Sequence, residues 1–219
     1  MNHTSAREIS KKRKNEAILN SAEKLFLQKG IDNTTMNDIA HEAGIGIATL
    51  FRYYPKKDKI ILTIAAEKVN TILKAFQLIE RKPVSCIEKI TLVLDFFIKQ
   101  MKEHNAALPK LLDNFINYAA VTRESFEDME MYTDVREEIT IAFTRMIENG
   151  KEDGSIRKDV NASQTIATII SNFSIFTLKL SLRDTTNLIE PELSTEEQLQ
   201  IMKNIYLEFL KPEKELPEE

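Results

Sequence analysis

Residues 34–59 read TTMNDIAHEAGIGIATLFRYYPKKDK, and this stretch decides the fold. Met36 and Ile39 begin an apolar pattern whose spacing places side chains on one face of a short helix. Thr35 directly precedes this pattern, and Asp38 lies three residues after Thr35. The pair resembles a capping box with Asp in place of Glu. The pattern therefore predicts a helix that begins near Met36.

A tight turn and a second short helix follow. Gly44 enters left-handed backbone conformations without steric cost, which predicts the end of the first helix, and Gly46 gives a second permissive position. Residues 47–54 then predict about two helical turns, which Pro55 ends. The expected faces are Leu50, Phe51 and Tyr54 on one side, and Ala48, Thr49, Arg52 and Tyr53 on the other. Two such helices indicate a helix-turn-helix, whose second helix can enter the DNA major groove.

These residues resemble a known family. AGIGIATLFRYYPKKDKII is similar to the A-G-V-S-x-G-T-L-Y-x-Y-F-x-x-K-E-x-L signature of the TetR family of bacterial transcriptional regulators. The resemblance implies an all-helical homodimer whose N-terminal domain binds operator DNA and whose larger C-terminal domain binds a small effector. Gly46 stands where the family often has Ser. Phe51 stands where it usually has Tyr, so this side chain lacks a hydroxyl that could donate to phosphate.

A second resemblance lies about a hundred residues further along the chain. ENGKEDGSIRKDV, residues 148–160, is similar to a G-x-x-x-G-x-I-R-x-D run that commonly precedes the last two helices of the family. Because this match is independent of the first, it makes a chance match to the DNA-binding motif less probable.

The charge is divided unevenly along the chain. The 219 residues carry a net charge of −4, but residues 1–60 hold eleven Lys or Arg against seven Asp or Glu, a balance of +4. Residues 61–219 therefore carry −8. A basic end attracts phosphate while an acidic remainder repels other polyanions, so we expect DNA affinity to fall steeply with salt.

The fold is predicted to be all-α. From residue 47 to residue 149 there is no glycine, and no clean alternating run indicates strands. After a first helix that runs to about Lys29 and the two helices described above, helical spacing predicts further helices. They cover 57–81, 84–103, 109–118, 132–149, 162–183 and 195–210. By the resemblance, helix 57–81 connects the two domains.

A basic cluster precedes the DNA-reading stretch. Lys11, Lys12, Arg13 and Lys14 are consecutive. They are typical of a solvated helix start; the alternative is an arm that touches phosphate or the minor groove. The sequence leaves both interpretations open.

We assign DNA contacts by residue chemistry. Ile47 and Ala48 could meet thymine methyl groups, although Ile47 could instead pack beneath the turn, and Arg52 could reach guanine or a phosphate. Hydroxyl groups on the reading helix suit phosphate positioning. The predicted DNA-binding residues are Thr35, Asn37, Ile47, Ala48, Thr49, Arg52, Tyr53 and Lys57.

An effector pocket between helices needs apolar walls with a few polar groups. The predicted ligand-binding residues are Phe97, Met101, Phe115, Tyr118, Phe143, Met146, Phe173 and Phe176. Each could instead be ordinary core, since Phe at helical spacing is what core looks like. The aromatic supply favours a hydrophobic or amphipathic effector, whose identity the sequence does not give.

No catalytic arrangement is evident. His3, His41 and His104 are scattered, none is spaced with Cys86 as a metal or nucleophile pair would be, and no Gly-rich phosphate loop occurs. We expect no enzyme activity, no cofactor and no metal. A single cysteine, no membrane-spanning apolar run and a polar start without an h-region favour a cytoplasmic protein.

The sequence therefore predicts a ligand-responsive, sequence-specific DNA-binding transcriptional regulator, with a repressor released from its operator by the effector as the expected form. Residues 1–56 are expected to form the helix-turn-helix domain, and residues 57–219 the effector-binding and dimerisation domain. By the resemblance, the last two helices pair with their copies in a homodimer. Two rivals remain: a helical interaction module that has lost DNA binding, and a small-molecule enzyme on a helical bundle. The operator, the effector, the regulated genes and the sign of regulation stay open.

Overall fold

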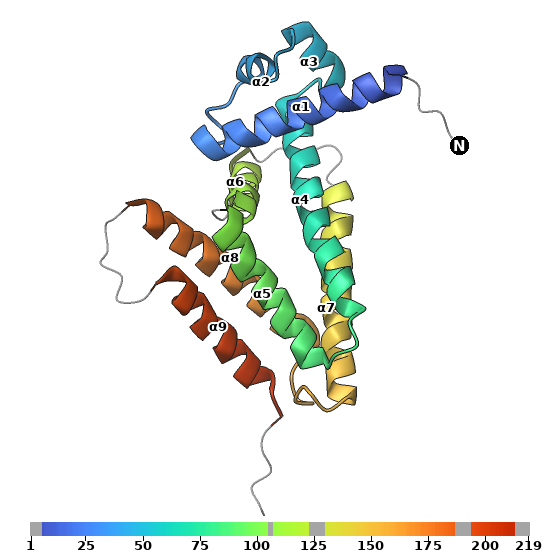
Figure 1. Ribbon diagram of the computed structural model, residues 1–219, viewed down its shortest axis with the longest axis vertical. Helices are drawn as coiled ribbons and strands as arrows, with labels where there is room; N and C mark the ends of the chain where they lie inside the picture. Colours follow the sequence, from blue (N-terminus) through green and yellow to red (C-terminus); the bar gives the residue numbers. More distant parts are fainter. Residues whose placement is uncertain (1–5, 105–106, 123–129, 187–193, 213–219) are drawn as a thin grey trace, which may run out of the picture. The chain divides into compact units, whose positions relative to one another are not determined.

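The computed structural model describes residues 6–104, 107–122, 130–186 and 194–212 (Figure 1). All regular structure in these residues is helical, so the predicted all-α class is confirmed. The helices are α1 (Ala6–Lys29), α2 (Met36–Glu42), α3 (Ile47–Tyr53), α4 (Lys57–Glu80), α5 (Cys86–His104), α6 (Ala107–Thr122), α7 (Glu130–Glu152), α8 (Ala162–Thr186) and α9 (Thr195–Leu210).

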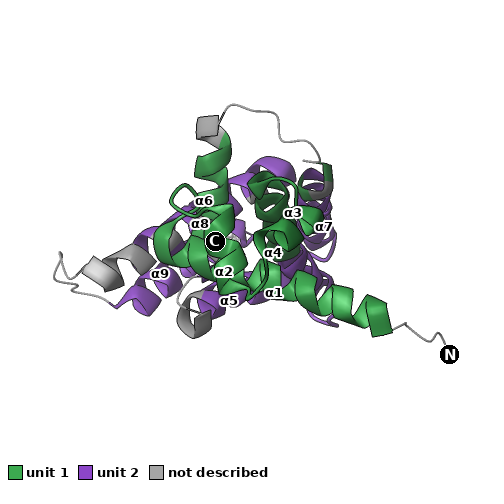
Figure 2. Cartoon of the chain, turned by 90° about the horizontal axis from the view of Figure 1, so that it is seen from above, with its two compact units in different colours: residues 1–68, 110–132 green, residues 69–109, 133–219 purple. Residues whose placement is uncertain are grey.

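The chain divides into two compact units, which Figure 2 colours separately. Unit 1 comprises Met1–Lys68 with Lys110–Tyr132, and unit 2 comprises Val69–Pro109 with Thr133–Glu219. Helices α4, α6 and α7 therefore each continue from one unit into the other. Unit 1 is larger than the expected DNA-binding domain, because it takes in the first half of α4 and most of α6. A functional boundary after residue 56 stays a prediction.

Unit 1 is built on α1. Ile18, Ala22 and Phe26 of this helix are buried, as are Ile39 of α2 and Leu50 of α3. In Figure 1, α1 runs beneath α2 and α3, and its N-terminal turns extend past both. Full burial of one such aliphatic or aromatic side chain contributes roughly 1.5–3 kcal/mol. This small core holds the two short helices in place.

Unit 2 carries a cluster of phenylalanines from four helices. Phe76 of α4 lies with its ring centroid 5.2 Å from that of Phe143 and 6.1 Å from that of Phe97. Phe173 of α8 adds a further contact, with its centroid 6.2 Å from that of Phe97. Such tilted and edge-to-face pairs are favoured by the ring quadrupoles.

The segment between α7 and α8 fastens unit 2. Asp153 accepts a hydrogen bond from the Cys86 amide at 3.1 Å, which satisfies a free donor at the start of α5. Burial, and then the hydrogen bond to the Asp153 carboxylate, raise the pKa of the Cys86 thiol to about 11. Four residues after Asp153, the Arg157 amide donates to the Leu210 carbonyl at 2.9 Å, where α9 ends. The second sequence motif is thus a structural junction.

Helix α7 continues to Glu152, beyond the end predicted at residue 149, so Gly150 lies within the helix. A Cβ at Gly150 would lie 2.4 Å from Cδ1 and 2.7 Å from Cγ1 of Ile156, and 3.0 Å from Cβ of Cys86. The left-handed turn falls instead at Gly154, with φ +76°. Gly150 is therefore required for close packing.

This close approach gives a stability prediction. In Gly150→Ala the buried Ile156 side chain must move, and overpacking of this kind costs about 1–3 kcal/mol. We expect a lower midpoint in urea unfolding with an unchanged slope. Gly46→Ala is the matched control, because nothing lies within 4 Å of a Cβ there. Equal stability of the Gly150→Ala variant and the wild type would show that Ile156 is free to move.

Candidate DNA-binding surface

The helix-turn-helix begins at a reciprocal cap. The Asp38 amide donates to Thr35 Oγ1 at 3.2 Å, and the Thr35 amide donates to Asp38 Oδ2 at 2.8 Å. The predicted capping box with Asp in the third position is therefore confirmed. Because both donors would otherwise be unsatisfied at a helix start, the cap fixes where α2 begins.

An ion pair reinforces this cap. Lys29 Nζ, at the end of α1, lies 2.8 Å from Asp38 Oδ2. The hydrogen bond from Lys29, followed by those from Thr35, holds the pKa of the Asp38 carboxyl well below its ordinary value. The stabilisation is therefore present above about pH 4 and is lost as the pH falls toward the lowered pKa. At neutral pH the end of α1 is tied to the start of α2.

The turn uses only one of its two glycines. Gly44 has φ +64°, the left-handed conformation expected of it. Gly46 has φ −69° and ψ 142°, so its expected role as a second permissive position is wrong. It serves instead as the N-cap of α3, where it makes no side-chain hydrogen bond. An L side chain could occupy this position without backbone strain.

The two faces of α3 differ in part from the prediction. Leu50 is fully buried and Tyr54 is 8% exposed, as expected for the inner face. Phe51 was grouped with them, but it is 47% exposed and lies on the outer face. Ile47, at 37% exposure, is also on the outer side and does not pack beneath the turn. The exposed face of α3 is Ile47, Ala48, Phe51 and Arg52.

The end of α3 is attached to α1. The Tyr54 hydroxyl donates to Asn15 Oδ1 at 2.8 Å, across 39 residues of sequence. Burial raises the pKa of this hydroxyl, so it stays protonated and able to donate at neutral pH. The exposed face of α3 is thus held on a short helix whose inner face and end are both fixed.

The other predicted DNA-binding residues differ in accessibility. Asn37 is exposed on α2, whereas Thr49 and Tyr53 are half-buried on α3. Thr35 is exposed, but its hydroxyl also donates to Asp38 at 2.7 Å within the cap. A DNA contact by each of these residues stays a prediction.

Lys57 at the start of α4 is directed toward the protein. Its Nζ donates to the Ile31 carbonyl at 2.9 Å and to the Thr34 carbonyl at 3.2 Å. The same ammonium lies 5.4 Å from the centroid of the Tyr118 ring, a cation–π distance. A phosphate contact by Lys57 stays a prediction, and it would require this ammonium to change partners.

Comparison with known proteins relates the helix-turn-helix region to a protein family. The family model described as "Bacterial regulatory proteins, tetR family" matches residues 18–64, from the buried part of α1 into α4. An HTH-type transcriptional regulator of Staphylococcus aureus strain bovine RF122 / ET3-1 is 29% identical over 126 residues, 57% of this chain and 68% of that protein. Residues 18–64 belong to the TetR family of bacterial regulatory proteins.

Solved structures of similar fold agree with the assignment. The fatty acid degradation regulator FadR from Bacillus halodurans has a TM-score of 0.70 at 14% identity, over 89% of this chain and 94% of that one. FadR from Bacillus subtilis, in complex with stearoyl-CoA, has a TM-score of 0.64 at 15% identity, over 89% and 98%. Identities this low show a shared fold alone.

The predicted effector residues of this TetR-family chain fall into groups. Phe97, Phe143 and Phe173 meet in the phenylalanine cluster of unit 2, together with Phe76, which the sequence analysis missed. Met146 is buried in α7 and Phe176 is half-buried in α8. Met101 lies in α5, with its side chain outside the described part of the chain.

The remaining two predicted effector residues lie in unit 1. Phe115 of α6 packs against Tyr132, with ring centroids 4.8 Å apart. Tyr118, one turn later, donates its hydroxyl to Asp58 Oδ1 at 2.9 Å. Both aromatic rings therefore contact residues of the unit that carries the helix-turn-helix.

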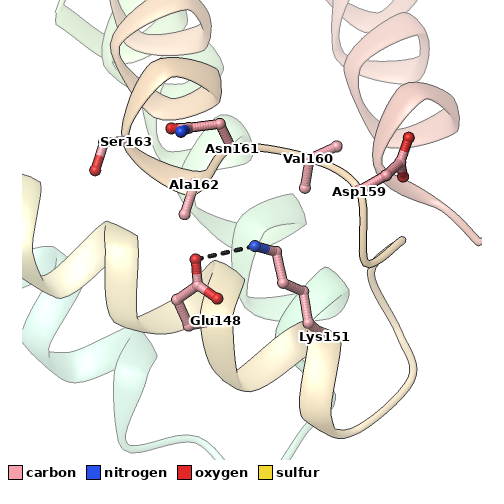
Figure 3. A pocket seen from close by; sticks show the side chains of 7 residues that line it. All are labelled: Glu148, Lys151, Asp159, Val160, Asn161, Ala162 and Ser163. Carbon is pink, nitrogen blue, oxygen red and sulfur yellow. Dashed lines mark hydrogen bonds and ion pairs between the residues drawn. The ribbon is translucent and has the colours of Figure 1, made fainter.

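A shallow hollow of about 370 Å³ lies elsewhere in unit 2 (Figure 3). Its lining is mostly polar, and Lys151 Nζ lies 3.0 Å from Glu148 Oε1 at its edge. The other lining residues are Asp159, Val160, Asn161, Ala162 and Ser163. None of the predicted effector residues contributes to it. Among the residues that the structure describes, no helix is both long and apolar enough to span a bilayer.

Proposed function

We propose that this TetR-family protein is a repressor that binds operator DNA as a homodimer and is released by a hydrophobic or amphipathic effector. The observation that carries the proposal is the exposed face of α3, a helix whose inner face and end are both fixed. A preorganised reading helix loses little conformational entropy when it binds.

The chemistry of the exposed face suits direct readout. Ile47, Ala48 and Phe51 offer apolar groups for thymine methyls, and Arg52 offers the paired donors that match guanine. Thr49, Tyr53 and Asn37 are suited to phosphate or sugar, which positions the helix without reading sequence. We therefore assign the base contacts to the exposed face of α3, and the phosphate contacts that orient the helix to Thr49, Tyr53 and Asn37.

Exposed apolar side chains on the last two helices support the homodimer. Ile201, Ile205 and Phe209 recur at four-residue spacing on α9 and are 48%, 61% and 50% exposed. Ile175 adds a further exposed side chain on α8. A two-fold interface over this surface would present two reading heads to successive turns of the major groove.

The effector is proposed to act within unit 2. Phe97 and Phe176 are half-buried beside fully buried aromatics, so this region offers apolar walls. Bacillus subtilis FadR binds stearoyl-CoA on a similar fold, which makes a long acyl chain a reasonable first effector class. The six predicted ligand-binding residues of unit 2 remain our candidates for this site: Phe97, Met101, Phe143, Met146, Phe173 and Phe176.

Contacts of α6 suggest a route for release. Tyr118 is bonded to Asp58, and its ring lies against the Lys57 ammonium, at the start of α4. Asn114 donates to the Phe26 carbonyl of α1 at 3.4 Å. Since α4 and α6 both continue into unit 2, a change there reaches these contacts through unbroken helices. An effector that favours one packing of unit 2 would shift the population of head orientations.

This route assigns functions to the two parts of the chain. Residues 1–56 would bind DNA, residues 57–219 would bind the effector and dimerise, and helix 57–81 would connect them. A regulator that acts on operator DNA works in the cytoplasm. These assignments rest on the proposed function.

Footprinting on the DNA that flanks the protein's own gene tests the proposal. We expect protection of a two-fold symmetric site, with half-sites one helical turn or a multiple of it apart, and affinity that falls steeply with salt. Stearoyl-CoA should weaken binding by a factor within the roughly 5–150-fold range typical of allosteric coupling, while CoA alone should not. Absence of sequence-specific, salt-dependent binding would overturn the DNA-binding proposal and favour an interaction module. Release by CoA alone would contradict the apolar effector.

A further inference from the structure

The N-terminal turns of α1 form a basic extension, residues 6–14. The sequence AREISKKRK holds five basic residues and one acidic residue, a net charge of +4. Every side chain in it is exposed, and burial in α1 begins only at Ile18. In Figures 1 and 2 this part of α1 projects beyond the other helices of unit 1. Packing of the domain therefore does not account for it.

The extension is helical, which decides between two ways of touching DNA. An α-helix with its side chains is about 10 Å across, whereas the minor groove is about 6 Å wide. Residues 6–14 therefore do not form a minor-groove arm. The positive charge of the extension can therefore contact the phosphates on the outside of the duplex.

One face of the extension continues the face of α1 that contacts the end of α3. Asn15 accepts the hydrogen bond from Tyr54 where α3 ends, so this face of α1 is turned toward the reading helix. Lys11 and Arg7 precede Asn15 by one and two helical turns on the same face, and Lys14 precedes the buried Ile18 by one turn. At a rise of about 1.5 Å per residue, Arg7 lies roughly 12 Å along the helix from Asn15. The major groove is about 12 Å wide, so the extension is long enough to reach from the reading helix to the phosphates at the edge of the groove.

We propose that Arg7, Lys11 and Lys14 bind the phosphate backbone beside the groove that α3 enters. The inference rests on the proposed DNA-binding function and adds a second, sequence-independent contact to it. Its chemistry is charge neutralisation with release of counterions, which strengthens binding to any duplex. Lys12 and Arg13 point to other sides of the helix, and Lys12 lies 3.9 Å from Glu16.

Two double variants with the same charge change test the proposal. Lys11→Gln/Lys14→Gln removes cations from the side of α1 that carries the buried Ile18, and Lys12→Gln/Arg13→Gln removes them from the other sides of the same turns. Gln is a good helix former and all four side chains are exposed, so circular dichroism should show unchanged helicity. Binding of the full-length protein is then measured on its footprinted duplex at several salt concentrations.

For Lys11→Gln/Lys14→Gln in a dimer, up to four phosphate contacts are lost. The slope of log affinity against log salt should become shallower by about 3.6, at about 0.9 per contact. Between about 50 and 200 mM salt, affinity should fall on the order of 100-fold less than it does for the wild type. The ratio of the affinity for the operator to the affinity for unrelated DNA should be the same in this variant as in the wild type. The Lys12→Gln/Arg13→Gln slope should change by less than half as much.

Each result is decisive. Equal slope changes in the two variants would show general attraction rather than a placed contact, and an unchanged slope in the first would exclude the contact; either overturns the proposal. Loss of operator preference in the first variant would assign these lysines to base reading instead and also overturn it. If the wild type itself fails to bind specifically, the proposed function fails, and that result is separate from the others.

Discussion

Ile205→Glu should convert the protein to a monomer and reduce operator affinity by about 100-fold or more. Ile205 is 61% exposed on α9, so the substitution leaves the folding of the subunit almost unchanged. In a two-fold interface each substitution occurs twice, and burial of an unpaired carboxylate costs several kcal/mol. Two linked heads bind by avidity that exceeds either head alone by roughly 10²–10⁴.

Ile141→Glu on α7 is the matched control. Ile141 is 53% exposed and lies in the same unit, but outside the last two helices. Light scattering coupled to size exclusion gives the mass, and gel shift gives the operator affinity. A dimeric Ile205→Glu with full affinity would show that the interface lies elsewhere. Loss of dimer in both variants would point to general destabilisation rather than to α9.

Local sequence patterns predicted the parts of the fold that local physics determines. Thr35 and Asp38 are three residues apart, and their reciprocal cap depends on nothing else in the chain. Gly44 ends α2 because only its own backbone angles matter there. The helix over residues 84–103 begins with another cap, in which Ser85 and Glu88 exchange hydrogen bonds. That pattern was equally visible in the sequence and was overlooked.

Contacts between distant residues were not predictable in the same way. Gly150 needs to lack a side chain because of Ile156 and Cys86, and Cys86 is 64 residues away in the sequence. Lys57 is directed to carbonyls 23 and 26 residues earlier, and Tyr118 is bonded across 60 residues. The periodicity of apolar residues along the sequence does not reveal such distant partners. Only the folded structure shows that Lys57, which we expected to contact a phosphate, already donates to two backbone carbonyls.

The faces of α3 illustrate a different limit. A seven-residue helix makes about two turns, so one residue at the edge of the apolar stripe can belong to either side. Phe51 was placed on the inner face together with Leu50 and Tyr54. Its four-residue spacing from Ile47 was the signal that it shares the outer face. The effector aromatics present the same ambiguity, since Phe143 and Phe173 are buried core whether or not a ligand enters beside them.

Arg52→Ala should reduce operator affinity by about 10- to 100-fold for each half-site. A bidentate pairing of Arg with guanine contributes about 1–3 kcal/mol of discrimination, and each 1.4 kcal/mol corresponds to tenfold. Arg52 is exposed at the end of α3, so its removal should not change the unfolding midpoint. Leu50→Ala, on the opposite face, is the contrast: it empties a fully buried site and should cost about 2–5 kcal/mol of stability.

The form of the Arg52→Ala defect identifies the group that Arg52 contacts. If the partner is a guanine, the variant should tolerate substitution of that base pair while the salt slope stays as in the wild type. If the partner is a phosphate, all duplexes should weaken together and the slope should become shallower by about 0.9 per subunit. Phe51→Ala should weaken discrimination against loss of a thymine methyl, with no change in slope. Because α3 is fixed by Leu50 and Tyr54, an Arg52→Ala protein that binds its operator as well as the wild type does would mean that this face does not enter the groove.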